Sequence, residues 1–107
     1  MAVIKTIDSR TMTHGGGEIR VEVWQDSLSR ACVRYNFAYV NGAIVARDNG
    51  RVVGFDDAHF YPGFSSKHHC HWMGNVYENK KPFDIATIDE RFNRFLRRLR
   101  QIHKRRF

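Results

Sequence analysis

The sequence contains only two cysteines and two prolines, and it has no long run of apolar residues. Two unpatterned cysteines, Cys32 and Cys70, argue against a disulfide-rich secreted scaffold, so both are expected to be free thiols. No stretch approaches the roughly 20 apolar residues of a membrane-spanning helix, and the first residues lack the apolar core of a signal peptide. We therefore expect a cytoplasmic protein that does not interact with membranes.

Enough apolar material is present for one core. The chain has 107 residues, of which 42% are hydrophobic and 13% aromatic, which fits one domain over residues 1–107 and excludes a disordered chain. Its formal net charge is +7, and eight Lys or Arg residues against two Asp or Glu residues lie from residue 86 onward. This uneven charge favours a polyanionic partner, either a nucleic acid or an acidic protein.

Alternating polar and apolar residues predict β-strands over 18–25 and 30–40. The segment before them, 1–17, ends in three glycines and is expected to be a leading segment with one short strand near 3–7. The pair Asn41-Gly42 predicts a type I′ hairpin with a return strand over 43–47.

Further along the chain, 48–50 predicts a second turn before a strand over 51–55. Residues 56–66 are expected to form a loop, and 67–72 an extended segment. The whole region 18–83 is expected to be a sheet that carries a His-rich loop or strand.

A helix is expected over 87–105. Thr87 and Glu90 match a capping box, which predicts the helix start. Apolar residues then recur at helical spacing on one stripe, namely Ile88, Phe92, Phe95, Leu96, Leu99 and Ile102. The predicted fold class is α+β, an antiparallel meander of about four to six strands packed against a basic amphipathic C-terminal helix.

The densest group of ionisable residues lies between Asp56 and His71. Four of the six histidines fall within thirteen positions there. If 67–72 is a strand, its period of two places His69 and His71 on one face. Two imidazoles with ordinary pKa values near 6.5 suit general acid/base cleavage of a phosphodiester. Asp56 is expected to take part with them, and Lys67 is expected to stabilise the developing charge.

Two other interpretations of this group stay open. Imidazole and carboxylate side chains also suit a divalent metal, with Asp56, His59, His69 and His71 as ligands, although the spacing matches no standard zinc pattern. Alternatively, the histidines form a polar strand edge whose rings satisfy buried backbone groups. Phosphate contacts are expected from one flank of the helix, at Arg91, Arg94, Arg98 and Arg105.

Several short motifs follow one another along the chain. They are Val21-Glu22-Val23-Trp24, the segment from Arg34 to Val40, Phe55-Asp56-Asp57, Lys67, His69-Cys70-His71-Trp72-Met73-Gly74, Tyr77-Glu78, Phe83 and the helix from Ile88. This order resembles the TumE-like toxins of type II toxin–antitoxin modules, over about residues 18–102, and H-x-H-x-x-G is its most specific element. Asp57 stands where the family pattern has Asn, and the loop over 58–66 is longer.

The resemblance implies a growth-inhibiting toxin that is paired with a DNA-binding antitoxin and acts on RNA. Our leading hypothesis is thus a toxin that binds and cleaves RNA without a required cofactor, with RNA and a cognate antitoxin as partners. A homo-oligomer is compatible with the sequence. One alternative is a non-enzymatic module that binds nucleic acid or the antitoxin and has structural histidines. The other is a metal-dependent nuclease, which would need a divalent ion.

Overall fold

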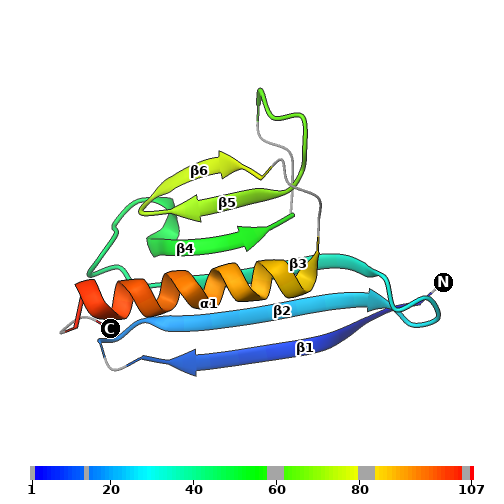
Figure 1. Cartoon of the computed structure of the whole chain (residues 1–107), viewed down its shortest axis with the longest axis horizontal. Helices are drawn as coiled ribbons and strands as arrows, with labels where there is room; N and C mark the ends of the chain where they lie inside the picture. The colour runs from blue at the N-terminus through cyan, green and yellow to red at the C-terminus, as the bar shows by residue number, and fades with distance from the viewer. Residues whose placement is uncertain (1, 14, 58–61, 80–83, 105–106) are drawn as a thin grey trace.

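The chain forms one antiparallel sheet in which every strand pairs with its neighbour in sequence. The computed structural model describes residues 2–13, 15–57, 62–79, 84–104 and 107. Six strands stand in the order β1 to β6, and helix α1 lies against one face of their sheet (Figure 1). The bounds are β1 Val3–Met12, β2 Glu18–Asp26, β3 Cys32–Val40, β4 Arg51–Asp56, β5 His69–Trp72, β6 Asn75–Glu78 and α1 Ile85–Ile102. The predicted α+β meander with a packed C-terminal helix is confirmed.

The leading segment is more regular than predicted. Instead of one short strand near 3–7, it forms the ten-residue edge strand β1, which pairs with β2 from Val3 to Met12. The glycines after it make the turn, in which Thr13 N–H donates to the Gly17 carbonyl and Gly16 has a φ of +83°. Every residue of β1 is exposed. An edge strand that buries little surface does not require alternating apolar residues. The sequence pattern therefore predicted a strand shorter than β1.

The predicted return strand over 43–47 is wrong. Asn41 instead folds the segment back on itself, because its side-chain oxygen accepts from Ala43 N–H at 3.0 Å and its carbonyl accepts from the N–H groups of Ile44 and Val45. A short 3₁₀ turn, η1 (Asp48–Gly50), then leads into β4, which is the strand that pairs with β3. The hairpin is therefore a long loop rather than a two-residue turn.

Helix α1 buries the predicted stripe, with two corrections at its ends. Ile88, Phe92, Leu96 and Leu99 are buried in the core, but Ile102 is 59% exposed. The helix begins earlier than predicted, because the Asp84 carboxylate, not Thr87, accepts the N–H of Ala86 at 3.1 Å. It ends at Ile102, three residues before the predicted end.

The core lies between α1 and the two central strands. Phe37 meets Phe92 edge to face at 5.7 Å between ring centroids, and Phe55 stacks with Phe95 at 6.1 Å. Trp72 of β5 also contacts Phe95, at 5.1 Å. Aromatic pairs at these separations add to the free energy gained from burial. They fix which face of the sheet α1 covers, and so which face remains open.

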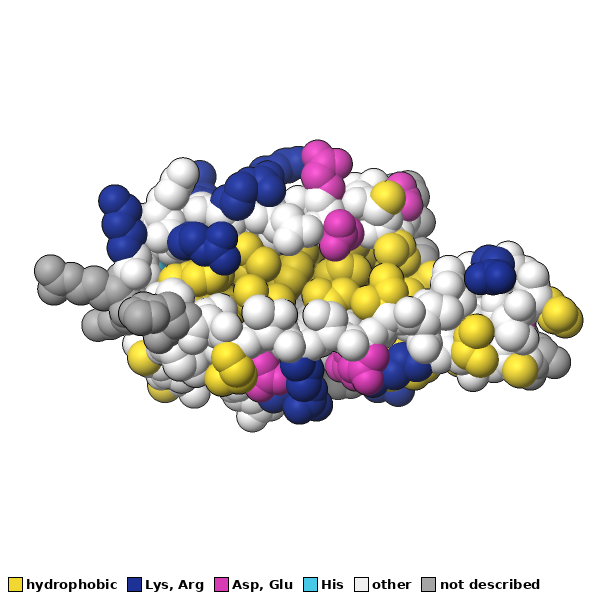
Figure 2. Space-filling model, turned by 90° about the horizontal axis from the view of Figure 1, so that it is seen from below, with side chains coloured by type: hydrophobic (Ala, Val, Ile, Leu, Met, Phe, Trp, Pro, Cys, Tyr) yellow, Lys and Arg dark blue, Asp and Glu magenta, His cyan; other side chains and the backbone are white. Residues whose placement is uncertain are grey.

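Helix α1 packs mainly on β3 and β4 and leaves part of its own side of the sheet uncovered over β1 and β2. The register there places Ile7 beside Val23, and Ile7 is 44% exposed. Figure 2 shows a strip of hydrophobic side chains along this side of the molecule, with charged side chains along both of its long edges. In the described part of the chain, no helix has the length and apolar character needed to span a membrane.

Candidate active site

The register of the central strands brings Asn36, Asp56 and His69 side by side. Asp56 of β4 pairs with Asn36 of β3 on one side and with His69 of β5 on the other. Phe55 and Trp72, which alternate with these residues, contact α1. Because side chains alternate along a strand, Asp56, His69 and His71 lie on the opposite side, which we call the open face. The prediction that His69 and His71 share one face is met by this register.

Asp56 contacts both histidines. Its Oδ1 atom lies against Nε2 of His69, and its Oδ2 atom lies 2.9 Å from Nε2 of His71. The exposed fraction of the side chain is 1% for His69, 0% for His71 and 6% for Asp56. The two imidazoles are therefore interior groups, and Asp56 is the member of the cluster that is nearest to solvent.

The outer nitrogen of each imidazole also has a partner. Nδ1 of His69 lies 2.9 Å from the backbone carbonyl of Lys67, and Nδ1 of His71 lies 2.6 Å from Oδ2 of Asp48. A carbonyl can only accept, so His69 carries its proton on Nδ1 and donates it to Lys67. The carboxylate of Asp48 holds His71 in the same orientation. Both rings are thereby fixed with Nε2 directed at Asp56.

Charge at the site favours a protonated imidazole. Burial by itself lowers the pKa of His69, but the hydrogen bond and negative charge of Asp56, with the bond to the Lys67 carbonyl, outweigh it. The pKa of His69 is therefore raised above its ordinary value. Arg51 opposes this shift through its own positive charge. A cation on the Asp56 side of the ring is what this environment stabilises.

A glycine stands opposite His71, at a close approach of β4 to the backbone of β3. Gly54 lies opposite His71 in the register, and a Cβ atom at that position would stand 3.6 Å from Cδ2 of the His71 ring and 2.9 Å from the carbonyl oxygen of Phe37. Real Cβ atoms essentially never approach a backbone oxygen so closely. A side chain at Gly54 would therefore collide with the backbone of β3, whereas its contact with the His71 ring would be an ordinary one.

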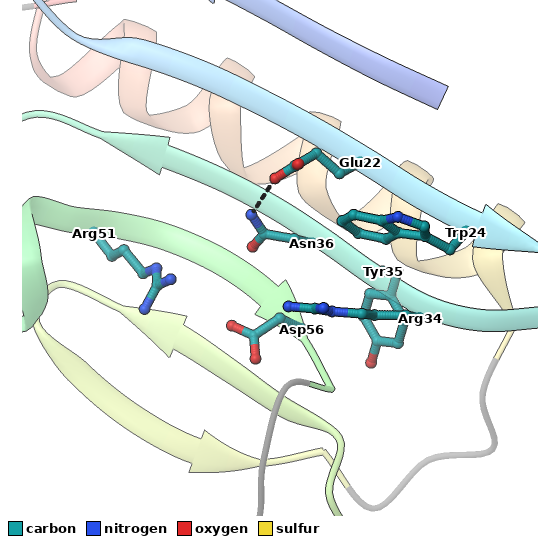
Figure 3. Close-up of a pocket in the computed structure, with 7 residues that line it drawn as sticks. All are labelled: Glu22, Trp24, Arg34, Tyr35, Asn36, Arg51 and Asp56. Atoms are coloured by element: carbon teal, nitrogen blue, oxygen red, sulfur yellow. Dashed lines mark hydrogen bonds between the residues drawn. The ribbon is translucent and has the colours of Figure 1, made fainter. Parts of the chain in front are cut away.

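The cluster opens at Asp56 into a pocket of about 240 Å³. Figure 3 shows the carboxylate of Asp56 between the side chains of Arg34 and Arg51. The other lining residues are Glu22, Trp24, Tyr35 and Asn36. Lys5 in turn stacks on the Trp24 ring at 5.0 Å, and Arg34 at 4.9 Å. The pocket thus offers two guanidinium groups, one indole ring and carboxylate oxygens beside the buried histidines.

Arg51 reaches this pocket because of an irregularity in the strand pairing. Tyr39 pairs with Val53 but Val40 pairs with Arg51, so one extra residue of β4 is inserted. A bulge of this kind shifts the alternation by one residue. It turns Arg51 to the open face with Asp56, although simple alternation from Asp56 would place it on the side of α1.

Several predicted site residues lie elsewhere. Lys67 takes part through its backbone carbonyl, while its side chain is exposed. Arg91, Arg94 and Arg98 are on α1, which covers the other side of the sheet from Asp56. Arg91 stacks over Phe55 at 4.9 Å, and Arg94 pairs with Glu90 at 3.1 Å. Two further predicted residues, His59 and Arg105, lie outside the described residues.

Neighbouring residues of the motif have structural partners. The Asp57 carboxylate accepts the backbone N–H of Tyr35 at 3.1 Å, which extends the pairing beyond the end of β4. His68 stacks on Tyr35 and bonds to its hydroxyl at 2.9 Å. Cys32 and Cys70 are both free thiols, as predicted. Burial raises the pKa of the Cys70 thiol to about 11, so Cys70 is not an activated nucleophile.

Sequence reasoning missed Asp48, Arg34, Asn36 and Arg51 as site residues. Arg34 and Asn36 carried a signal, since both occupy the polar side of the alternating segment 30–40. Asp48 was interpreted only as a turn former, and the bulge that places Arg51 leaves no local mark in the sequence. Comparison with family models, with curated proteins and with solved structures finds no match for this chain.

Proposed function

We propose that this protein is the toxin of a type II toxin–antitoxin module and that it binds and cleaves RNA on the open face. One observation carries the proposal. A buried Asp56–His69–His71 cluster meets a pocket at Asp56, and that pocket is flanked by Arg34 and Arg51. Carboxylate and imidazole groups move protons, guanidinium groups hold phosphates, and RNA cleavage needs both. The motif order shared with TumE-like toxins supports the same function.

The geometry favours Asp56 as the catalytic residue. Asp56 accepts the proton of the ribose 2′-hydroxyl while the 2′ oxygen attacks phosphorus. The Asp56 carboxyl group then gives a proton to the leaving 5′ oxygen, and the product is a 2′,3′-cyclic phosphate. His69 and His71 contact the carboxylate of Asp56 and are too buried to contact RNA, so they act as positioning residues. The sequence-based hypothesis of two imidazoles in direct contact with the substrate is thereby revised.

The remaining pocket residues suit a nucleotide. Arg34 and Arg51 are placed to stabilise charge on the non-bridging phosphate oxygens. A base could stack on the Trp24 ring by displacing Lys5 or Arg34, which lie over it at 5.0 and 4.9 Å, and such stacking is worth about 1–3 kcal/mol per base in single-strand binders. An unpaired RNA strand is the form that presents such a base. The proposed substrate is therefore single-stranded RNA.

A second candidate function is a non-enzymatic module that binds RNA or an antitoxin. The burial of His69 and His71 favours it, because interior histidines with satisfied nitrogens also serve as structural groups. The exposed arginines of α1, including Arg94 and Arg98, would then carry the binding. In both candidates we place the protein in the cytoplasm, where RNA and an antitoxin partner are accessible.

Inducible expression of wild type and of Asp56→Asn tests the enzyme. Growth and total RNA integrity are followed in both strains, and the purified proteins are then incubated with a labelled single-stranded RNA. We expect growth arrest and RNA fragments only with wild type, and a 10²- to 10⁴-fold loss of cleavage in Asp56→Asn, the usual contribution of a general acid/base group. Asp89→Asn, at an exposed carboxylate on α1, is the matched control and should retain full activity.

A second pair of variants tests which face binds RNA. Arg34→Ala/Arg51→Ala removes two guanidinium groups beside Asp56, and Arg94→Ala/Arg98→Ala removes two from α1. We expect the first to weaken RNA binding and to reduce its salt dependence, and the second to change little. Growth arrest that persists in Asp56→Asn with intact RNA, together with loss of binding in the α1 variant, would favour the non-enzymatic module instead.

A further inference from the structure

Three electron-pair donors converge at one point on the open face. Nε2 of His69, Nε2 of His71 and a carboxylate oxygen of Asp56 all lie within 4.8 Å of one another, and all three residues are buried. Two imidazoles and one carboxylate form a donor set that suits zinc and neighbouring divalent transition metals, whereas magnesium and calcium prefer oxygen ligands alone. The donors come from adjacent strands, so paired backbone fixes their spacing.

The outer nitrogens show the arrangement that metal-bound histidines have. A histidine ligand almost always donates its other N–H to a backbone carbonyl or a carboxylate, which fixes the ring and directs the free nitrogen at the metal. Here His69 has the Lys67 carbonyl at 2.9 Å, and His71 has the Asp48 carboxylate at 2.6 Å. Both Nδ1 positions are occupied by acceptors, so in the neutral form of each ring the unprotonated nitrogen is Nε2, which lies against the carboxylate of Asp56.

When both rings are neutral, their Nε2 lone pairs and the buried carboxylate repel one another unless a positive charge lies between them. Two further negative or polar groups add to this need. Asp48 carries its carboxylate to the far side of His71, and Oδ1 of Asn36, beside Asp56 in the register, is a buried oxygen with no hydrogen-bond partner among the described residues. A cation at the point of convergence would offset the repulsion among the three donors.

From this geometry we propose that His69, His71 and Asp56 bind one divalent transition-metal ion, of which zinc is the best match. The pocket beside Asp56 leaves one side of the site open, which is the arrangement of a metal centre that also binds water or substrate. Binding of the ion stands on its own, whereas its use in RNA cleavage rests on the proposed function. Protons on the two Nε2 atoms would meet the same electrostatic need, so the experiment must detect the ion itself.

Calorimetric titration of the chelator-stripped full-length protein with ZnCl₂ is the test. We expect one ion per chain for wild type, no binding at this site for His71→Ala, and far weaker binding of MgCl₂. His68→Ala is the control, because it removes the adjacent histidine, whose ring bonds to Tyr35 instead of pointing to Asp56. Zinc binding that is absent in wild type, or equal in wild type and His71→Ala, would overturn the proposal.

Two measurements remain informative even if ligand variants fail to fold. Asp48→Asn keeps all three ligands and weakens only the support of His71, so zinc affinity should fall about 10- to 100-fold. In wild type, zinc should shift the imidazole ¹⁵N resonances of His69 and His71 and leave those of His68 and His103 in place. Unchanged resonances, or unchanged affinity in Asp48→Asn, would count against the site.

Cleavage assays separate this proposal from the proposed function. RNA cleavage that is lost in chelator and restored by ZnCl₂ supports a catalytic ion. Cleavage that persists in chelator, while zinc binds as expected, rejects the catalytic use and leaves the binding site established. If no RNA is cleaved under any condition, the proposed function fails, and the titration still decides whether the ion binds.

Discussion

The carboxylate of Asp48 lies 2.6 Å from Nδ1 of His71, although 23 residues separate the two in sequence. Asp48 belongs to the turn η1, where it and Asn49 both have a φ of 53°. This left-handed conformation costs an L-residue roughly 1–2 kcal/mol. Strain of this kind persists where the surrounding structure needs it. At Asp48 the need is evident, because only this turn carries its carboxylate to the buried imidazole.

Glycine substitutions at these two positions should therefore have opposite effects. Asp48→Gly relieves the backbone but leaves the Nδ1–H of buried His71 without its acceptor, so we expect the free energy of unfolding to fall by about 1–3 kcal/mol. Asn49→Gly relieves the same conformation at an exposed side chain, and we expect no loss, or a gain of up to about 1 kcal/mol. Urea denaturation in the presence of chelator measures both. Equal effects would mean that the Asp48 contact contributes nothing to stability.

Gly54 provides a second prediction, about the space beneath His71. In Gly54→Ala, the new Cβ atom would stand 2.9 Å from the Phe37 carbonyl oxygen, which belongs to paired backbone and cannot move aside. We expect a loss of about 1–3 kcal/mol in the free energy of unfolding, as for other overpacked sites.

Gly42→Ala is the matched control for Gly54→Ala. A Cβ atom at Gly42 meets nothing within 4 Å, so its effect should stay within about 0.5 kcal/mol. Denaturation midpoints of the two variants are compared with wild type. A Gly54→Ala protein as stable as Gly42→Ala would show that β4 has room for a side chain against the Phe37 carbonyl of β3.

Much of this fold follows from local patterns in the sequence. Alternation predicts β2 and β3, and helical spacing predicts the face of α1 that Phe92 and Leu96 bury, because each pattern reflects burial of one face. The shared face of His69 and His71 follows from the same alternation. The full length of strand β1 was not predicted, because an edge strand buries too few apolar side chains to impose alternation on its sequence. Residues 43–47 were wrongly predicted to form a strand, because the side-chain hydrogen bond of Asn41 competes with hairpin pairing.

The site itself depends on long-range register, which local patterns do not encode. The pairing of β4 with β5 places Asp56 directly opposite His69, and a register shifted by one residue would separate them. The extra residue of β4 between Arg51 and Val53 determines that Arg51 reaches the pocket. Asp48 meets His71 only because the whole loop over 41–50 folds over the sheet. The residue types thus indicated the chemistry of the site, whereas the strand register determines which residues line the pocket.

The start of α1 supplies a third prediction. Asp84 accepts from the Ala86 N–H and from the Thr87 hydroxyl, so it is the residue that caps the helix. Asp84→Ala should lower the free energy of unfolding by about 0.5–2 kcal/mol. Thr87→Ala, inside the exposed first turn, should cost less, since alanine has the better helix propensity. Thermal denaturation of both variants gives the comparison, and a larger loss in Thr87→Ala would restore the sequence-based assignment of the cap.

The last prediction concerns the edge strand and pH. Lys5 of β1 lies 2.7 Å from Glu22 of β2, and this bond, with one from Asn36, lowers the pKa of Glu22 below its ordinary value of 4.5. A lowered carboxyl pKa means that the folded state favours the ionised form. The resulting stability is complete above pH 4.5 and is lost as pH falls through the folded pKa of Glu22.

Glu22→Gln should accordingly be less stable than wild type at neutral pH, by at most about 1 kcal/mol because the pair is partly exposed. The difference should shrink as pH falls below about 4.5, the ordinary pKa of a glutamate side chain. Denaturant titrations at a series of pH values measure it, with Glu90→Gln on α1 as the control for a more exposed pair with Arg94. A difference that stays constant with pH would show that Lys5 does not hold β1 to Glu22 by charge, and that backbone pairing alone keeps the edge strand in place.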